Sequence, residues 1–280
     1  MTGKRIKARD AVVILFEITG IILAIIFVYP AVMVIVNAFK PLGEILINPF
    51  ALPKNFTTAN IMSIIRNMGF FRALFNTVFI AVIVVLFTVT LSAMAGYKLQ
   101  RFGGKISAVI SILFISCMLV PFQTIIIPVA KMARTLGIVG TTFGYILITI
   151  PLYAPLGIFV CQGFIKTVPK SLEESAVLDG CNPFAVFFFI VFPLLKSVLS
   201  SIAILYTLWI WNDYALAALM LPSQAKRTLT LMVYSGFSTY LNRWDFSIAA
   251  LSLSIIPVMV FYIFMQKYII QGVTAGAVKG

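Results

Sequence analysis

The sequence predicts an all-α, polytopic membrane protein with six transmembrane helices, and three observations support this. Of the 280 residues, 61% are hydrophobic and only 10% are charged, and the mean hydropathy is +1.08. A soluble domain carries about 25% charged residues, so this composition suits a bilayer rather than water. Six apolar stretches reach the roughly 20 residues that one span requires. We therefore expect a single transmembrane domain over residues 1–280, without a separate soluble domain.

The spans are expected to be helices because backbone in hydrocarbon must satisfy its own hydrogen bonds, and the ten-residue alternating strands of a barrel are not seen. The predicted spans are residues 11–38, 73–97, 106–130, 141–165, 197–221 and 246–270. Prolines inside these stretches, such as Pro121 and Pro257, are expected to kink their helices. The first stretch exceeds the hydrophobic region of a signal peptide, so we expect it to remain as helix 1.

The basic residues indicate an orientation. Six spans place both termini on one side of the membrane, and four basic residues precede the first span (Lys4, Arg5, Lys7 and Arg9). The first helix usually dominates topology, so the positive-inside rule favours cytoplasmic termini. The net charge of +13 comes from Lys and Arg at the ends of apolar runs. Nucleic acid is therefore not an expected partner.

Catalytic and metal chemistry are not expected. The chain has no His, which excludes the usual zinc sites and His-based triads. The three Cys residues form no CxxC pair and suit small buried hydrophobic positions. Gly103-Gly104-Lys105 lacks the flanking residues of a P-loop. We expect no catalytic residue, no metal and no cofactor bound by this chain.

A polar stretch between the fourth and fifth spans, residues 166–196, is longer than two adjacent helices need. Ser171 and Glu174 have the spacing of a capping box. Gly180 suits a left-handed helix stop, and Asn182 with Pro183 suits the start of another helix. The sequence therefore predicts two short helices that meet at Gly180, with Ala176 and Gly180 giving one face small side chains.

This stretch resembles the EAA loop of ABC importer permeases, whose pattern is E-A-A-x3-G-x9-I-x-L-P. Here it reads Glu174-Ser175-Ala176-x3-Gly180, then nine residues and Ile190-x-Phe192-Pro193. The resemblance implies a cytoplasmic coupling loop whose first helix docks in a cleft of a separate ATPase subunit. The positions expected to make that contact are Leu172, Glu173, Glu174, Ala176, Asp179 and Gly180. A capped amphipathic surface helix is the alternative interpretation.

Two further segments resemble the carbohydrate-importer permeases of the maltose-transporter type. Residues 211–214 match a W-N-[DE]-[FY] stretch, and residues 272–280 match a G-x-T-x-G-A-V-K-G tail. The resemblance implies the smaller of two homologous permeases, with the cytoplasmic tail (residues 271–280) reaching the ATPases through Thr274, Gly276 and Lys279. Without a partner, a tail rich in small residues is expected to be flexible.

Asp213 is a candidate for the substrate path. An ionised carboxylate near mid-membrane costs about 2.5–3.5 kcal/mol, so it is expected to face a wet cavity or a partner. Neighbouring aromatic and amide groups have the chemistry that binds sugar hydroxyls and rings. The candidate residues are Trp209, Trp211, Asn212, Asp213 and Tyr214. An aromatic belt, with Asp213 near the interface or paired across a subunit boundary, is the alternative.

The resemblance thus implies the permease subunit of an ATP-driven importer for a mono- or oligosaccharide, in a bacterial or archaeal cytoplasmic membrane. Its implied partners are a second permease, two cytosolic ATPases that bind the ATP, an extracytoplasmic solute-binding protein and the bilayer. The same importer class with a non-sugar cargo, such as glycerol phosphate, stays open. An ion-coupled secondary transporter is disfavoured because few acidic residues lie in the spans and no internal repeat is visible.

Overall fold

The computed structural model describes residues 8–239 and 243–277, with side chains described for residues 12–236 and 243–267. Within these ranges the chain is helical and contains no strand, as the sequence predicts. Four helices are long and apolar enough to cross a membrane, and up to six spans result if each of two bent helix pairs counts as one. The predicted all-α membrane fold is therefore confirmed.

The chain divides into two compact units, whereas the sequence predicted one transmembrane domain over residues 1–280. Unit 1 comprises Met1–Met68 and Ser235–Pro257, and unit 2 comprises Gly69–Tyr234 and Val258–Gly280. Helices α13 and α14 each belong partly to both units. We describe each unit by itself.

Four predicted spans correspond to continuous helices. They are α1 (Ala8–Asn37), α4 (Phe70–Phe102), α7 (Thr142–Ile165) and α14 (Trp244–Ala277). Each contains a window of high hydropathy with few charges, which is the pattern expected of a span. Prolines occur inside α1, α7 and α14, whereas α4 contains none.

The predicted span over residues 106–130 is wrong as a single helix. It forms α5 (Gly104–Leu119) and α6 (Phe122–Thr135), which meet at 103°. Pro121 lacks an N–H and disfavours helical backbone at Val120, which adopts extended angles (φ −80°, ψ 118°). The proline therefore breaks the helix instead of only kinking it.

The predicted span over residues 197–221 also divides. Helix α11 (Lys196–Asn212) ends where Asp213 is extended (φ −71°, ψ 111°), and a short α12 (Ala215–Met220) follows. A 3-10 turn η2 (Gln224–Lys226) then precedes α13 (Leu229–Thr239). The structure therefore places Asp213 in a helix break instead of inside a continuous span.

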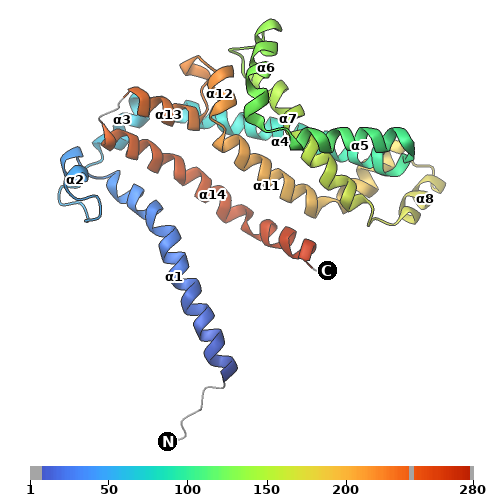
Figure 1. Cartoon of the computed structure of the whole chain (residues 1–280), viewed down its shortest axis with the longest axis horizontal. Coiled ribbons are helices and arrows are strands. Elements are labelled where there is room, and N and C mark those ends of the chain that lie inside the picture. The colour runs from blue at the N-terminus through green and yellow to red at the C-terminus, as the bar shows by residue number, and fades with distance from the viewer. Residues whose placement is uncertain (1–7, 240–242, 278–280) are drawn as a thin grey trace, which may run out of the picture. The chain divides into compact units, whose positions relative to one another are not determined.

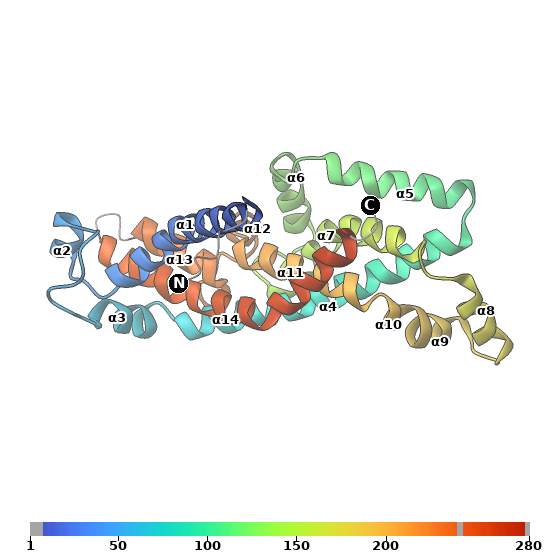
Figure 2. The ribbon, with the colours of Figure 1, turned by 90° about the horizontal axis from the view of Figure 1, so that it is seen from below.

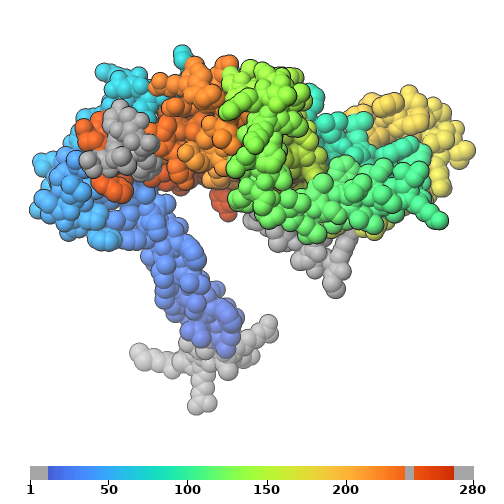
Figure 3. All heavy atoms as spheres, turned by 45° about the horizontal axis from the view of Figure 1, so that its top comes forward, coloured from blue at the N-terminus to red at the C-terminus, as the bar shows by residue number. Residues whose placement is uncertain are grey.

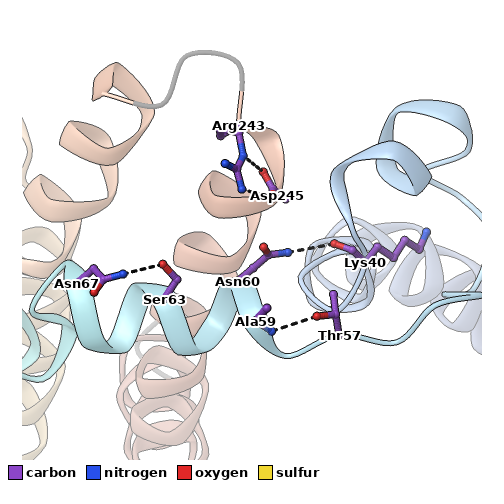
Figure 4. Close-up of polar contacts among 8 residues, drawn as sticks. All are labelled: Lys40, Thr57, Ala59, Asn60, Ser63, Asn67, Arg243 and Asp245. Carbon is purple, nitrogen blue, oxygen red and sulfur yellow. Dashed lines mark hydrogen bonds and ion pairs between the residues drawn. The ribbon is translucent and has the colours of Figure 1, made fainter.

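Unit 1 contains α1, two short helices and the parts of α13 and α14 that lie in residues 235–257. The short helices are α2 (Leu42–Ile47) and α3 (Ala59–Asn67). The buried Asn60 side chain of α3 donates to the Lys40 carbonyl at 3.1 Å, and Arg243 pairs with Asp245 at 2.9 Å (Figure 4). The Lys40 amino group donates to the Pro49 carbonyl at 3.3 Å. The two contacts of Lys40 fasten the connection after α1, and the Arg243–Asp245 pair lies at the start of α14.

Unit 2 is built around α4, α7 and α11, which pack along one another (Figures 1 and 2). Small residues let α4 and α7 approach closely. A Cβ at Gly96 would lie 2.9 Å from the Cys161 Cβ, and a Cβ at Gly157 would lie 2.5 Å from the Ser92 Oγ. Hydrophobic contact among these helices then forms the core of the unit.

Helices α5 and α6 lie at the surface of unit 2 (Figure 3). The polar stretch after α7 forms α8 (Lys170–Leu178), a short α9 (Pro183–Ala185), the π-helical turn η1 (Val186–Val191) and α10 (Phe192–Leu194). In both Figure 1 and Figure 2 the helix α8 lies at one end of unit 2, beyond the ends of α4 and α7. This end carries the loop that the sequence singles out.

Candidate functional site

The turn between α8 and α9 has the predicted chemistry. Gly180 adopts a left-handed conformation with φ +86°, and its N–H donates to the Val177 carbonyl at 3.0 Å. The Asn182 side chain accepts from the Ala185 N–H at 2.8 Å, with Pro183 as the first helical residue. The helix stop and the second helix start are therefore confirmed.

The predicted capping box is wrong. Helix α8 begins at Lys170, directly after Pro169, and no side chain caps its first turn. Ser171 therefore lies one residue inside the helix, where it cannot act as the N-cap. Pro169 gives a physical reason, because its fixed φ makes the preceding chain extended and sets where the helix starts.

Glu173 points at α4, not at a free surface. Its Oε1 accepts from Arg101 Nε at 2.7 Å and forms an ion pair with Arg101 Nη2 at 2.6 Å, and its Oε2 accepts from the Tyr97 hydroxyl at 2.8 Å. Arg101 Nη2 also donates to the Val168 carbonyl at 2.8 Å. The side chains of Arg101 and Glu173 are only 9% and 13% exposed. The Glu173 carboxylate is therefore paired within the chain, and its contact with an ATPase stays a prediction.

Ala176 also fails to face outward, since it is 7% exposed and α8 packs on η1. Of the predicted small-residue face, Ala176 therefore packs within the loop, whereas Gly180 does not. Four of the other residues predicted to contact an ATPase are exposed, namely Leu172, Glu174, Asp179 and Gly180. Glu174 is thus the acidic residue of the Glu173-Glu174 pair that remains accessible.

The loop also exposes large apolar side chains. The most exposed are Leu178 at 88% and Phe189 at 79%, and the others are Val177 and Phe184. The sequence analysis did not assign these four side chains to a site, although large apolar residues in a polar loop are the usual signal of an interaction surface. We call Leu172, Glu174, Val177, Leu178, Asp179, Phe184 and Phe189 the loop surface.

At the other end of α7, Asp213 is held within the chain. Its Oδ2 accepts from the Tyr145 hydroxyl at 2.5 Å, and its Oδ1 accepts from the Leu216 N–H at 3.1 Å. The second bond lies in the first turn of α12, where a carboxylate satisfies a free backbone N–H. Asp213 therefore joins α7 to the break between α11 and α12. The sequence expected a wet cavity or a partner, and the partner is Tyr145.

The aromatic candidates differ in exposure. Trp209 is 40% exposed and makes an edge contact with Tyr153, with ring centroids 5.2 Å apart. Tyr214 is 44% exposed and lies 4.6 Å from the Tyr234 ring. Trp211 is half-buried, and its carbonyl accepts a hydrogen bond from Thr230. Trp209 and Tyr214 thus keep an accessible face for a ring contact.

Asn212 is exposed, and its amide donates to the Leu208 carbonyl in its own helix at 2.8 Å. The predicted tail residues give less information. Thr274 and Gly276 lie in α14, where only the backbone is described, and Lys279 lies outside the described residues altogether.

The described residues hold no cluster of three or more potential metal ligands among His, Cys, Asp and Glu. The cysteines are free, with Cys161 buried and Cys117 and Cys181 exposed. One end of unit 2 thus carries a loop with exposed apolar and acidic side chains. The other end carries accessible aromatic and amide groups.

These observations define the class: an all-helical, multi-pass membrane protein with a structured polar loop before its fifth span. The family model of the "binding-protein-dependent transport system inner membrane component" matches residues 88–275. The chain belongs to this family and is a permease subunit of an ABC importer, an integral component of the inner membrane. The matched range includes the loop, Asp213 and the aromatic residues around it.

Three similar proteins cover 73% to 95% of the chain. The probable starch degradation products transport system permease AmyC of Thermoanaerobacterium thermosulfurigenes is 35% identical over 95% of this chain and 96% of its own length. The melibiose/raffinose/stachyose import permease MelC of Bacillus subtilis is 36% identical over 73% of this chain and 75% of its own. The arabinooligosaccharides permease AraQ of Halalkalibacterium halodurans is 30% identical over 92% and 93%.

One solved structure supports the fold. A bacterial ABC transporter involved in the import of the acidic polysaccharide alginate contains a chain with a TM-score of 0.80 to this one. The match covers 95% of this chain and 99% of that chain, at 21% identity. The shared architecture therefore extends over the whole length of both chains.

Proposed function

We propose that this chain imports an oligosaccharide as one of two homologous permease subunits. The observation that carries the proposal is the similarity to saccharide permeases over almost the full length of the chain. An extracytoplasmic solute-binding protein delivers the saccharide, and two cytosolic ATPase subunits bind and hydrolyse the ATP. The chain itself binds no nucleotide and requires no cofactor. Alternating access follows from the motion that these ATPases impose on the loop between α7 and α11.

The loop surface is the proposed ATPase contact. It combines exposed apolar side chains, such as Leu178 and Phe189, with the accessible carboxylates of Glu174 and Asp179. Large apolar residues at the centre of a contact supply most binding energy, and charges at its rim set orientation. Gly180 shapes the turn and is part of the same contact. Thr274, Gly276 and Lys279 extend this contact between the two ATPases.

This assignment sets the orientation. The loop surface must face the cytosol, where the ATPases are, and both termini are then cytoplasmic. The basic residues that precede α1 agree with this orientation under the positive-inside rule. The end of unit 2 that carries Asp213 then faces the opposite side of the membrane.

The proposed solute path passes the exposed residues near the end of α11. Trp209 and Tyr214 offer ring faces, and Asn212 offers an amide. Sugar rings stack on aromatic side chains, and sugar hydroxyls exchange hydrogen bonds with amides. Asp213 and Trp211 position these groups, because both make hydrogen bonds inside the chain.

The test is transport by the complete complex in proteoliposomes. The chain is co-expressed with its second permease, ATPase and binding protein, and uptake of labelled starch-derived, raffinose-type and arabinose-type oligosaccharides is measured. We expect ATP-dependent uptake of at least one of them, which requires the binding protein. Glycerol phosphate serves as the non-sugar comparison. Uptake of glycerol phosphate alone would overturn the saccharide assignment, and uptake by this chain without ATP would overturn the whole proposal.

A further inference from the structure

Side chains from the end of α4 contact the loop at three residues. Arg101 contacts Val168, two residues before α8, and Glu173 within α8. The Tyr97 hydroxyl reaches the same Glu173, and its ring lies 5.3 Å from the Phe187 ring in η1. Tyr97 and Arg101 are four residues apart, so both project from one face of α4. We call Tyr97, Arg101 and Glu173 the clamp.

The three residues of the clamp are joined by short, largely buried hydrogen bonds. Both oxygens of the Glu173 carboxylate have donors at 2.8 Å or less, and both charged side chains are nearly buried. Charge-assisted hydrogen bonds are roughly twice as strong as neutral ones, and burial reduces their screening by salt. The loop is thus attached to α4 by side chains as well as to α7 and α11 through the chain.

Helix α4 is suited to carry a displacement away from the clamp. Its 33 residues extend about 50 Å at 1.5 Å per residue, and it contains no proline. By contrast, α7 contains Pro151 and Pro155. A helix with an unbroken ladder of backbone hydrogen bonds transmits motion along its axis with little bending.

The other end of α4 is fastened as well. The Asn76 amide donates to the carbonyls of Ala225 and Arg227, both at 3.0 Å. The Thr77 Oγ1 accepts from the Leu229 N–H at 2.7 Å, at the start of α13. Helix α4 therefore joins the loop at one end of unit 2 to the segment between α12 and α13 at the other.

We propose that α4 is the element that carries motion of the coupling loop across the membrane, and that Tyr97 and Arg101 are positioning residues that fix α8 to it through Glu173. This inference rests on the proposed function, because it takes the loop as the point where the ATPases act. The proposal gives two adjacent glutamates different roles. Glu174 contacts the ATPase, whereas Glu173 transmits the resulting motion to α4.

The first test removes both charges of the clamp, because removal of one would leave a buried charge unpaired. In the reconstituted complex, Arg101→Met with Glu173→Gln should keep ATPase co-purification and ATP hydrolysis. Saccharide uptake per ATP hydrolysed should fall by about fivefold or more, the lower end of typical allosteric coupling. Lys98→Met is the matched control, because Lys98 is an exposed basic residue of α4 over the Phe102 ring, and it should leave this ratio within about twofold.

Two results would overturn the proposal. One is an uptake-to-ATP ratio of the double variant within twofold of wild type. The other is loss of ATPase co-purification, which would mean that the clamp shapes the docking surface instead of transmitting motion. Glu174→Gln gives the contrast, since it should weaken co-purification. Failure of the wild-type complex to import any saccharide would instead refute the proposed function.

A second test does not depend on the stability of the charge-free variant. Arg101→Cys and Glu173→Cys are combined in a chain whose Cys117, Cys161 and Cys181 are replaced by alanine. Uptake per ATP should be low before treatment and should rise severalfold once a short thiol-reactive crosslinker joins the two positions, because a fixed connection replaces the clamp. A crosslink that leaves the ratio low would show that α8 must move relative to α4, and the proposal would be wrong.

Discussion

Among its described side chains, unit 2 contains two hydrogen bonds between a tyrosine and a carboxylate, one near each end of α7. At the loop end, Glu173 accepts from Tyr97 and also pairs with the Arg101 guanidinium. At the other end, Asp213 accepts from Tyr145 and from the backbone N–H of Leu216. The two carboxylates look alike in sequence, because each follows polar or aromatic residues that suggest an exposed contact.

The difference lies in what each carboxylate joins. Glu173 connects two helices through an ion pair, so the connection holds α8, which is proposed to receive a force from outside. Asp213 instead closes a break in its own chain and fixes that break to α7. We therefore expect changes at the loop end to alter coupling, and changes around Asp213 to alter stability. The following predictions test this division, from the largest effect to the smallest.

Gly180→Pro should give the largest functional loss. A Cβ at Gly180 would meet nothing within 4 Å, so its left-handed φ of +86°, and not space, is the constraint. Proline is restricted to a φ near −65° and would open the turn between α8 and α9. We expect solute-stimulated ATP hydrolysis in the reconstituted complex to fall by on the order of tenfold or more, while membrane insertion persists.

Gly180→Asn is the graded comparison, because asparagine tolerates the left-handed region better than other side chains. It should lose clearly less stimulated hydrolysis than the proline variant. Equal losses would show that the glycine is needed for close approach of a partner and not for the turn. Normal stimulated hydrolysis in Gly180→Pro would remove the loop end from the coupling mechanism.

Asp213→Leu should give the largest loss of stability. It removes the acceptor of the Tyr145 hydroxyl and of the Leu216 N–H, which leaves two largely buried donors without partners. Each such group costs about 1–3 kcal/mol, so the variant should lose about 3 kcal/mol. Thermal unfolding of the purified complex in detergent measures this as a lower midpoint.

The matched control is Asn212→Leu at the adjacent, exposed position, where the amide bonds only within its own helix among the described contacts. A surface change of this kind should cost less than about 0.5 kcal/mol. If both variants unfold at the wild-type temperature and only saccharide affinity changes, Asp213 acts on the solute and not on the fold.

Two tyrosine variants compare the two ends directly. Tyr145→Phe removes one of the two hydrogen-bond donors to Asp213 described above, whereas Tyr97→Phe leaves Glu173 paired with Arg101. We expect losses of about 1–2 kcal/mol and about 0.5–1 kcal/mol respectively. Thermal unfolding of both variants provides the comparison, and the reverse order would contradict the structural role assigned to Asp213.

The local features of the loop could be predicted from the sequence because their physical causes lie within a few residues. The left-handed Gly180 and the Asn182 cap with Pro183 are of this kind. The capping box failed although it is also local, because Pro169 sets the start of α8 two residues earlier. Sequence spacing alone does not decide between two such competing starts.

Contacts between distant residues were missed for a different reason. Glu173 pairs with Arg101, 72 positions earlier, and Asp213 bonds Tyr145, 68 positions earlier. No sequence periodicity predicts either pair, because packing of α4, α7 and α11 brings the partners together. For the same reason Pro121 could be predicted to disturb a helix, but whether it kinks or breaks it depends on what supports each half.

Glu44 in unit 1 extends the comparison to a carboxylate at the surface, outside the spans. Its oxygens accept from the backbone N–H groups of Lys54 and Asn55 at 3.0 and 2.9 Å, and from the Asn55 amide at 2.7 Å. Partial desolvation raises the pKa of Glu44, but these hydrogen bonds together with nearby Lys40 outweigh it and hold that pKa below its ordinary value.

A carboxyl group with a lowered pKa stabilises the folded loop above its unfolded pKa, and this contribution is lost as the pH falls through the folded value. Protection of the Lys54 and Asn55 amides against hydrogen exchange, corrected for the intrinsic pH dependence, should therefore fall as the pH drops below the ordinary range of glutamate. Glu44→Gln should remove most of this pH dependence. If Glu44→Gln kept this pH dependence, another group would hold the loop. Because Glu44 is at the surface, the effect of Glu44→Gln should be the smallest among the four predictions.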